Sequence, residues 1–301
     1  MTKTVFLTGS SSGFGKAAVA QFHAAGWHVV ATMLESSVEV FHDTWDKQTD
    51  RLLVLPLDVT DPEATEASLD TAAAHFGGID TIVNIAGFGM FHPFETTTAK
   101  DVRLLFDTNC FGPMTLIRQA IPHLRARGGG SIVNLTAGSA VVPEPLMAAY
   151  NASKAALDNL SEAIRYELAP QGISVRVIEP GFVPTTGFVQ RIQETAAGRA
   201  IPEVYLDYVG QRLASFGMAT GRALASADDV AQVILEAATD HSGQLRYLVG
   251  DDQIERMRMR HSTSEPEYDA WAWANFGPRS NDTALDAAAE RATGSSPTTA
   301  A

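Results

Sequence analysis

The residues with the clearest chemical potential lie at the start of a helical stretch in the middle of the chain. Tyr150 and Lys154 stand four positions apart in the segment Tyr150-Asn151-Ala152-Ser153-Lys154. Residues at i and i+4 share one face of a helix, so the phenol and the ammonium can project together. A neighbouring cation lowers the pKa of a tyrosine from its usual ~10 toward the working range of an acid–base group. The pair predicts proton transfer at Tyr150; the alternative is a helix-start aromatic beside a solvated lysine.

A glycine-rich turn near the beginning of the chain is the second chemical signal. The segment Thr8-Gly9-Ser10-Ser11-Ser12-Gly13-Phe14-Gly15 joins a strand-like run to an alanine-rich helical run. Glycines let a backbone approach a diphosphate closely, and the start of a helix supplies N–H donors and partial positive charge. The turn therefore predicts a phosphate-binding loop, although a purely structural turn has the same appearance.

Strand-like and helical runs alternate through most of the chain and would place both features at one edge of a sheet. This order is typical of an α/β fold with a doubly wound parallel sheet (Rossmann-type) and helices on both faces, which binds ligands at the carboxyl ends of its strands. The expected strands are Thr4–Thr8, His28–Thr32, Leu52–Leu57, Thr81–Asn84, Ser131–Leu135, Ser174–Ile178 and Leu245–Val249. The expected helical stretches are 14–25, 62–76, 98–127, 150–169 and 226–239.

Residues 1–250 are expected to form one dinucleotide-binding and catalytic domain. Within it, residues 182–225 are rich in aromatic side chains and contain no strand pattern, which favours a substrate lid over ordinary helical packing. Residues 251–301 form a C-terminal extension with an aromatic patch that could cover the domain or a neighbouring subunit. Its last ~20 residues, 280–301, are rich in Ser, Thr and Ala and are predicted to be disordered.

Composition excludes several classes of function. The 301 residues include 22 Lys and Arg against 35 Asp and Glu, a net charge of −13 that argues against nucleic-acid and anionic-membrane partners. No apolar run approaches the ~20 residues that span a bilayer, and the strand-like start leaves no room for a signal peptide. Cys110 is the single cysteine, and the histidines lack partners at ligand spacing, so neither disulfides nor a metal site are expected. The sequence predicts a cytoplasmic protein.

Residues at the end of the second expected strand bear on whether the nucleotide is NAD or NADP. A dinucleotide site distinguishes a free ribose 2′-OH from a 2′-phosphate by an acid or an arginine placed there. Glu35 follows this strand, and the chain holds no Lys or Arg between Lys16 and Lys47. Glu35 could accept a ribose hydroxyl or could be a surface carboxylate. The pattern favours NAD, with NADP left open.

Several motifs, in the right order, resemble the short-chain dehydrogenase/reductase family over roughly residues 3 to 250. The segments that carry the resemblance are TGSSSGFG, Leu57-Asp58-Val59-Thr60, Asn84-Ile85-Ala86-Gly87, Asn109, Tyr150/Lys154 and Pro180-Gly181-Phe182-Val183-Pro184-Thr185. The resemblance implies that Tyr150 is the acid–base residue, that Lys154 lowers its pKa and holds the nicotinamide ribose, and that Asn109 supports the lysine through water. It also implies a set of cofactor contacts: Gly9, Ser11, Ser12, Gly13, Phe14, Gly15, Asp58, Val59, Asn84, Ala86, Gly87, Tyr150, Lys154, Pro180, Gly181, Val183 and Thr185.

One position departs from the family pattern where a catalytic serine is expected. Counting back thirteen positions from Tyr150 gives Ala137, which has no hydroxyl to donate to a substrate oxygen. Losing such a donor commonly lowers a rate by about 10²–10³. Ser139 shares the strand parity of Ala137 and could replace it, Thr136 would do so only if the strand twisted, or no side chain replaces it. Ile85, in place of a second asparagine, should affect local stability more than chemistry.

The residues that the resemblance places around the pocket mouth are mostly apolar. They are Phe88, Met90, Phe91, Pro145, Leu146, Met147, Phe182 and Val183. This set favours an apolar or aromatic secondary alcohol or ketone as substrate. The expected function is NAD(P)-dependent hydride transfer in a homo-oligomer, either a dimer or a tetramer by family analogy. The alternatives are a nucleotide-binding sensor or scaffold with little redox activity, and a non-redox dehydratase or cyclase.

Overall fold

Seven parallel strands form the central sheet of the computed structural model, which describes residues 2–45, 50–184, 186–196, 199–218 and 224–279. The strand order is β3-β2-β1-β4-β5-β6-β7, so the chain winds outward from β1 in both directions and confirms the doubly wound prediction. The strands are β1 (Thr4–Leu7), β2 (His28–Met33), β3 (Leu52–Pro56), β4 (Thr81–Asn84), β5 (Gly130–Leu135), β6 (Ile173–Pro180) and β7 (Arg246–Val249).

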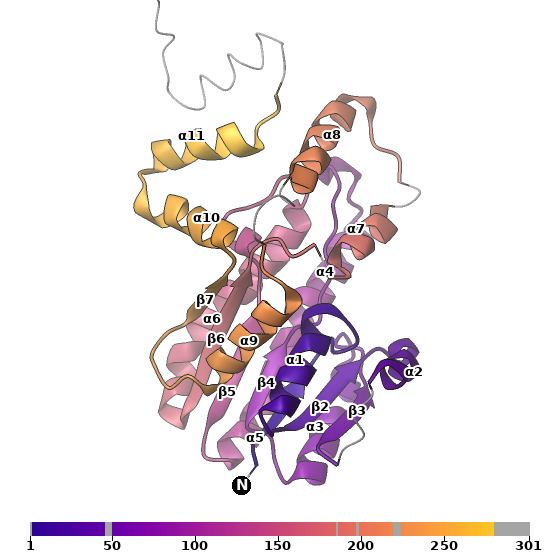
Figure 1. Ribbon diagram of the computed structural model, residues 1–301, viewed down its shortest axis with the longest axis vertical. Helices are drawn as coiled ribbons and strands as arrows, with labels where there is room; N and C mark the ends of the chain where they lie inside the picture. Colours follow the sequence, from indigo (N-terminus) through magenta and orange to yellow (C-terminus); the bar gives the residue numbers. More distant parts are fainter. Residues whose placement is uncertain (1, 46–49, 185, 197–198, 219–223, 280–301) are drawn as a thin grey trace, which may run out of the picture.

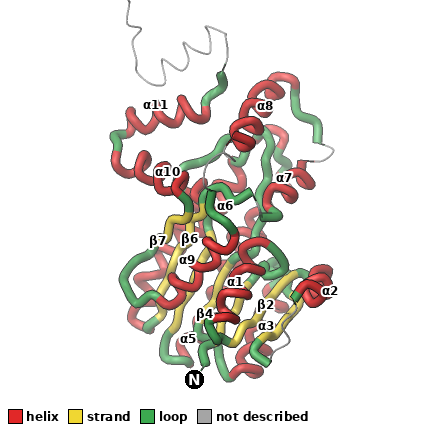
Figure 2. Tube along the Cα trace, in the orientation of Figure 1, coloured by secondary structure: helices red, strands yellow, loops and turns green. Residues whose placement is uncertain are grey.

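Helices cover both faces of the sheet, as Figures 1 and 2 show. One face carries α1 (Gly13–Ala24), α2 (Glu35–Thr44) and α9 (Ala227–Thr239), and the other carries α3 (Pro62–Phe76), α5 (Gly112–Ala126) and α6 (Ala148–Leu168). Successive strand residues point to opposite faces, so Val5 and Leu7 join the first layer while Phe6 joins the second. Both faces are therefore apolar, as a buried parallel sheet requires.

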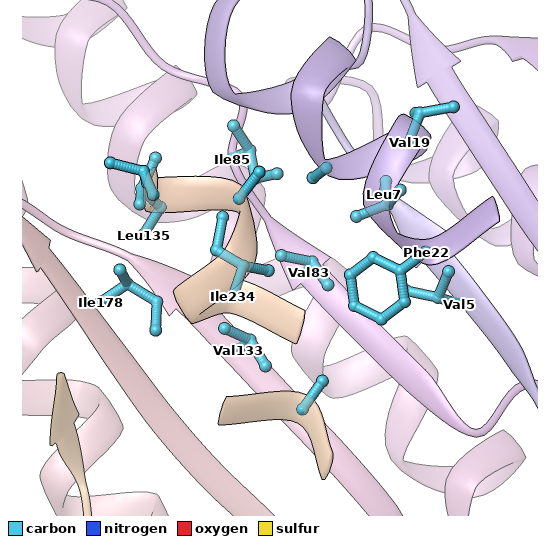
Figure 3. Packing of buried hydrophobic residues seen from close by; sticks show 14 of the residues in the cluster. Val5, Leu7, Val19, Phe22, Val83, Ile85, Val133, Leu135, Ile178 and Ile234 are labelled. Atoms are coloured by element: carbon cyan, nitrogen blue, oxygen red, sulfur yellow. The ribbon is translucent and has the colours of Figure 1, made fainter. Parts of the chain in front are cut away.

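The layer formed by α1, α2 and α9 packs against the central strands of the sheet. Figure 3 shows Val19 and Phe22 of α1 and Ile234 of α9 lying over residues of the central strands. Ile85, which follows β4, is 8% exposed and belongs to the same cluster. The side chain that departs from the family pattern at this position thus contributes to packing of the core.

The stretch 98–127 was predicted as helical throughout, and the structure divides it. It consists of α4 (Ala99–Phe106), a π-helical turn η2 (Asp107–Phe111) and α5. Hydrophobic periodicity does not distinguish one wider turn from a continuous α-helix. π-Turns occur frequently at functional sites, and this one contains Asn109.

Several helices fall where the sequence analysis named none. They are α2, α7 (Phe188–Ala196), α8 (Glu203–Met218), α10 (Asp251–Ser262) and α11 (Glu265–Phe276). Short helical turns occur at η1 (Phe94–Thr96), η3 (Gly138–Ala140) and η4 (Ala169–Gln171). Helices α10 and α11 follow directly after β7 and lie beside α8 at one end of the molecule (Figure 1). The predicted disorder of 280–301 concerns residues outside those described.

Among the residues that the structure describes, no helix combines the length and the apolarity that a membrane span requires.

Candidate active site

The glycine-rich turn after β1 packs against the end of β4. Gly9 has φ +67°, and a Cβ added there would lie 2.8 Å from the backbone N and Cα of Ala86. A Cβ at Gly15 would lie 2.0 Å from the carbonyl oxygen of Gly9. Both positions therefore need glycine, one for its backbone conformation and close contact and the other for space.

The start of α1 is arranged to receive an anion. Ser12 is the N-cap residue, but its side chain makes no capping hydrogen bond, and the first turn holds no acidic residue. Gly13 has φ +49°, with the side chain of Thr186 as the nearest neighbour of an added Cβ at 3.4 Å. N–H groups at a helix start that no side chain caps favour phosphate binding. The turn, with Ser11 and Phe14, fits the diphosphate of a dinucleotide.

Residues at the ends of β2 and β3 lie at the same edge of the sheet. Glu35 is exposed in the first turn of α2. The exposed Asp58 accepts hydrogen bonds from the backbone N and hydroxyl of Thr60 at 2.9 and 2.8 Å, which fixes its carboxylate. Lys16, in the first turn of α1, donates to Thr44 Oγ1 at 2.7 Å.

The segment after β4 is held by two sets of hydrogen bonds. Thr8 Oγ1 accepts from the backbone N of Ile85 and of Ala86 at 3.0 and 3.1 Å. The buried Asn84 amide donates to Asn134 Oδ1 at 2.8 Å, so this side chain is engaged within the sheet. Gly87 follows at the sheet edge, where a Cβ would lie 2.9 Å from Asn109 Oδ1 and 3.3 Å from Lys154 Nζ.

Asn109 and Lys154 come together beside Gly87, where η2 and α6 meet, and Tyr150 lies one turn earlier in α6. Asn109 Nδ2 donates to Phe88 O and Ser153 Oγ at 3.0 and 3.1 Å, and its Oδ1 accepts from Phe88 N at 3.1 Å. Lys154 Nζ donates to the carbonyl oxygen of Leu135 at 2.9 Å. All three side chains are at most 8% exposed. Asn109 thus joins the loop after β4 to helix α6.

The protonation equilibria of the pair follow from burial. Burial raises the pKa of the Tyr150 phenol, and the predicted lowering by Lys154 does not appear in this structure. Burial also lowers the pKa of Lys154 to about 8, with the neighbouring Cys110 thiol acting in the opposite direction. Removing charged groups from water disfavours their charged forms, which explains the direction of both shifts.

The residues around Ala137 separate the two side chains considered as replacements for the missing serine. Thr136 Oγ1 donates to Ile178 O at 3.3 Å, so it faces β6. Ser139 is 9% exposed, and its hydroxyl is buried without a hydrogen-bond partner among the described residues. Buried hydroxyls are usually paired, so an unpaired one beside a site is available to a ligand.

A hollow beside Tyr150 collects these groups at the carboxyl end of the sheet. It is open to solvent, and its walls enclose about 470 Å³ of space when the open mouth is included. We call it the Tyr150 hollow. Its lining residues are Ala137, Gly138, Ser139, Glu144, Met147, Tyr150, Pro180, Gly181, Phe182, Phe188, Gln253 and Arg256.

The apolar residues expected at the pocket mouth lie in three different regions of the structure. Met147 and Phe182 line the hollow. Phe88, Met90, Phe91 and Leu146 pack with Tyr150 in an adjoining apolar cluster. Val183 is buried in the core beside α9, and Thr185 lies outside the described residues.

The lid segment 182–225 contacts Tyr150 directly. The rings of Phe188 in α7 and Tyr150 have centroids 5.5 Å apart, inclined at 56°. Gly89 makes room for this phenylalanine, since a Cβ there would lie 2.4 Å from its ring. Leu146, with φ +64°, offers its carbonyl to the backbone N of His92 at 2.7 Å. A left-handed conformation in a branched residue beside a site is a strained feature.

Three contacts hold the segment 182–225 against the loop that follows β4 and the start of α4. Arg199 donates to both carboxylate oxygens of Asp101 at 2.5 and 2.6 Å, and this arginine holds the pKa of Asp101 well below its usual range. The Tyr205 hydroxyl donates to Glu95 at 2.8 Å. His92 Nε2 lies 3.2 Å from Thr195 O, and burial lowers the pKa of that imidazole.

The C-terminal extension supplies residues that the sequence analysis did not assign to the site. Gln253 and Arg256 of α10 line the Tyr150 hollow. Asp252 accepts from the backbone N of Phe182 at 3.2 Å, and a Cβ at Gly138 would lie 1.8 Å from Gln253 Oε1. No short-range pattern pointed to these residues, because they reach the site only when α10 folds back across the ends of β6 and β7.

Metal-ligating side chains do not gather in this region. Within the described part of the chain, no group of three or more His, Cys, Asp or Glu residues is placed to hold a metal ion.

The chain resembles known proteins over most of its length. A family model described as short chain dehydrogenase matches residues 3–197. An uncharacterized oxidoreductase of Schizosaccharomyces pombe is 33% identical over 219 residues, which are 73% of this chain and 90% of the relative. A 3beta-hydroxysteroid dehydrogenase of Eggerthella lenta is 32% identical, over 69% of this chain and 81% of the relative.

Solved structures agree in fold. A short-chain dehydrogenase from Streptomyces avermitilis superposes with a TM-score of 0.72 at 31% identity, covering 85% of this chain and 91% of that chain. A short chain dehydrogenase/reductase from Burkholderia phymatum in complex with NAD gives a TM-score of 0.72 at 23% identity, over 87% and 93% of the two chains. The predicted family and fold class are confirmed: the chain belongs to the short-chain dehydrogenase/reductase family of NAD(P)-dependent oxidoreductases.

Proposed function

We propose that the protein transfers hydride between a nicotinamide cofactor and an apolar or aromatic secondary alcohol or ketone, with Tyr150 as the acid–base residue. The observation that carries this proposal is the Tyr150 hollow, which brings the phenol and the unpartnered Ser139 hydroxyl to the carboxyl end of the sheet. Met147, Phe182 and Phe188 give the hollow an apolar lining. Apolar walls with a few convergent polar groups are typical of small-molecule sites.

The cofactor would be held along the sheet edge that begins at the glycine-rich turn. Gly9, Ser11, Ser12, Gly13, Phe14 and Gly15 would bind its diphosphate, and Asp58 and Val59 would bind the adenine. Ala86, Gly87, Pro180, Gly181, Val183 and Thr185 would line the nicotinamide half, with Asn84 fixing β4 beside them. When bound, the cofactor supplies or accepts the hydride. Glu35 and the engagement of Lys16 with Thr44 favour NAD, and NADP remains the alternative.

The proton would move at the Tyr150 hydroxyl. During reduction Tyr150 donates to the developing alkoxide, and during oxidation it accepts from the alcohol. Lys154 lies in the next turn of α6 and would hold the nicotinamide ribose, while Asn109 positions α6 against the loop after β4. Ser139 would hold the substrate oxygen in place of the missing serine at Ala137, since its hydroxyl has no partner among the described residues.

Ala137 favours a second candidate, a nucleotide-binding protein with little redox activity. Its methyl group lines the Tyr150 hollow where a hydroxyl would complete the family's catalytic set. A non-redox dehydratase or cyclase that uses Tyr150 alone would need the same pocket. Both alternatives predict cofactor binding without turnover of a simple ketone.

A homo-oligomer in the cytoplasm is the setting that we propose. Leu104 of α4, Phe111 of η2 and Tyr166 of α6 are 47%, 51% and 67% exposed, respectively. Large apolar side chains left exposed on neighbouring elements are suited to contacts between subunits.

The test is turnover of aryl and alicyclic ketones with NADH and with NADPH, compared between the wild type and three variants. Ser139→Ala should lower kcat about 10–10³-fold, because it removes the proposed oxyanion donor. Ala137→Ser should restore part of that loss in the double variant. Thr136→Ser serves as the matched control, since it keeps the hydrogen bond to Ile178 O. Cofactor binding without turnover of any ketone would support the second candidate.

A further inference from the structure

The wall of the Tyr150 hollow that α10 provides is charged, unlike the walls that the family motifs provide. Arg256 of α10 and Glu144 of the loop before α6 both line the hollow. Arg256 donates to Glu144 Oε1, and Arg212 of α8 donates to Glu144 Oε2 at 3.3 Å. Three segments far apart in sequence thus meet at one carboxylate, which is 8% exposed.

The charges in this cluster do not cancel. Two guanidinium groups, those of Arg212 and Arg256, share the one carboxylate of Glu144, so the cluster carries an excess of one positive charge. Both guanidiniums also lie over the ring of Phe276 in α11, at 5.3 and 5.6 Å from its centroid. An aromatic face stabilises a nearby cation but leaves its N–H donors available at the edge.

Arg256 lines the hollow and has N–H groups without an acceptor among the described residues, whereas Arg212 does not line the hollow. Arg212 donates to Asn275 O at 2.7 Å in addition to Glu144, and its side chain is 10% exposed. Arg256 has Glu144 as its one hydrogen-bond acceptor among the described residues, and its side chain is 27% exposed. A guanidinium carries five N–H donors in a planar fork, so most of those on Arg256 can serve a ligand in the hollow.

We propose that Arg256 binds a carboxylate on the substrate, remote from the reacting carbon, and that the preferred substrates are apolar keto acids and the corresponding hydroxy acids. This inference rests on the proposed function and narrows it. During reduction, hydride adds to the carbonyl carbon, the proton of Tyr150 goes to its oxygen, and the nicotinamide is oxidised. The carboxylate is unchanged by the reaction and serves to orient the substrate between Arg256 and Tyr150.

The excess of one positive charge favours a carboxylate over a phosphate monoester as the bound anion. A carboxylate carries a single negative charge and matches the fork of a guanidinium in geometry. A phosphate monoester carries close to two charges and would place the second near the Glu144 carboxylate, which repels it. The apolar lining from Met147, Phe182 and Phe188 then suits the body of the substrate.

The experiment compares a ketone that carries a carboxylate with its uncharged methyl ester. Kinetics are measured with para-acetylbenzoate and with its methyl ester, in the wild type and in Arg256→Gln and Arg256→Lys. For the acid, Arg256→Gln should raise KM roughly ten- to hundredfold, because a charge-assisted hydrogen bond is lost. The KM of Arg256→Lys for the acid should lie between those of the wild type and Arg256→Gln, since lysine keeps the charge but lacks the planar guanidinium fork. For the ester, KM should change less than about threefold.

Arg258→Gln is the matched control. Arg258 lies two positions further along α10 and is exposed, so its removal should leave both KM values unchanged. Equal KM changes for acid and ester in Arg256→Gln, or equal KM values for acid and ester in the wild type, would overturn the inference while leaving the proposed function intact.

A binding readout separates the two levels of the proposal. Benzoate and benzamide, which cannot be reduced as ketones, are added to the protein with NADH, and the melting temperature is followed. In the wild type, benzoate should raise the melting temperature and benzamide should not, and the effect of benzoate should disappear in Arg256→Gln. Absence of turnover with every ketone would refute the proposed function, whereas an equal response to the two probes would refute the role of Arg256.

Discussion

The nucleotide side and the substrate side of this molecule are built by different means. The nucleotide side depends on backbone and on short motifs: the turn at Gly9–Gly15, the segment after β4 and the first turn of α6. The substrate side depends on side-chain contacts between segments far apart in sequence, such as Asp101 with Arg199 and Glu144 with Arg256. The family model ends at residue 197, so it covers the first side and only part of the second.

This difference separates what is fixed from what can change. Backbone contacts of the glycine turn tolerate almost no added atom, since a Cβ at Gly9 or Gly15 would overlap main chain. Ion pairs between long side chains can be rearranged by single substitutions, with smaller costs to folding. The chemistry can therefore stay constant while the pocket that selects the substrate is rebuilt.

The largest expected effect lies at the junction of the two sides. Tyr150→Phe should lower kcat/KM about 10²–10⁴-fold, because the variant has no proton to transfer. Binding of NADH, followed by its fluorescence, should be retained. Tyr166→Phe on the same helix is the control, since that ring is 67% exposed and lies away from the hollow lining. Full activity in Tyr150→Phe would remove the assigned mechanism.

The nucleotide side should respond next most strongly, to Gly9→Ala. The added methyl group meets Ala86 backbone at 2.8 Å in a left-handed conformation, so we expect a loss of roughly 2–5 kcal/mol in stability together with weaker NADH binding. Calorimetry and NADH titration measure both. Gly26→Ala isolates the contact from the backbone strain, because Gly26 has φ +85° with nothing within 4 Å. Equal losses in the two variants would show that the turn does not need its close approach.

The substrate side should respond more mildly, to Arg199→Gln. This change removes the paired hydrogen bonds to Asp101 that tie the lid to α4, and we expect KM to rise about three- to tenfold with little change in NADH affinity. Arg191→Gln in α7 is the control, since its pair with Glu194 is 3.2 Å long and exposed on both sides. A fall in NADH affinity equal to the rise in KM would mean that the two sides are not separable.

The last prediction concerns the pH dependence of stability and involves a buried acid between the two sides. Burial and the neighbouring Asp158 carboxylate raise the pKa of Glu179 from 4.5 to about 7, against the opposing effects of Arg246 and Gln253. The folded state then holds a proton that the unfolded state releases, so this contribution to stability is lost as pH rises from 4.5 to 7.

Glu179→Gln should therefore flatten the stability profile in that window by roughly 1–3 kcal/mol. Urea unfolding at several pH values measures it. Glu162→Gln provides the comparison, because that exposed carboxylate also pairs with Arg246 but its pKa is lowered by this arginine. An unchanged slope in Glu179→Gln would assign the pH dependence to other groups.

The sequence predicted the nucleotide side closely because its information is local. Strand alternation gave all seven strands within a few residues, and the glycine turn, Asn109, Tyr150 and Lys154 are brought to one edge of the sheet. The predicted direction of the Tyr150 pKa was wrong, because helical spacing does not reveal how completely α6 is covered by Phe188 and the loop after β4.

The substrate side could not be predicted in the same way. The sequence indicated a hollow with few fixed charges, and Gln253, Arg256 and Glu144 line it instead. Gln253 and Arg256 lie more than a hundred positions from Glu144 and Tyr150, and no periodicity links the two pairs. The sequence likewise could not separate Ser139 from Thr136, whereas the structure gives Thr136 a hydrogen bond to Ile178 O and leaves the Ser139 hydroxyl without a partner among the described residues.

The bare backbone at Gly138 and Gly181 has a consequence for how this enzyme could diversify. Each glycine faces a side chain of α10, Gln253 in one case and Asp252 in the other, at distances that leave no room for a methyl group. A side chain added at either glycine would displace the end of the α10 side chain that faces it, at the wall of the hollow that also carries Arg256. The shape of the hollow is therefore open to change at two positions outside α10, and loss of α10 would alter the hollow while leaving the glycine-rich turn after β1 in place.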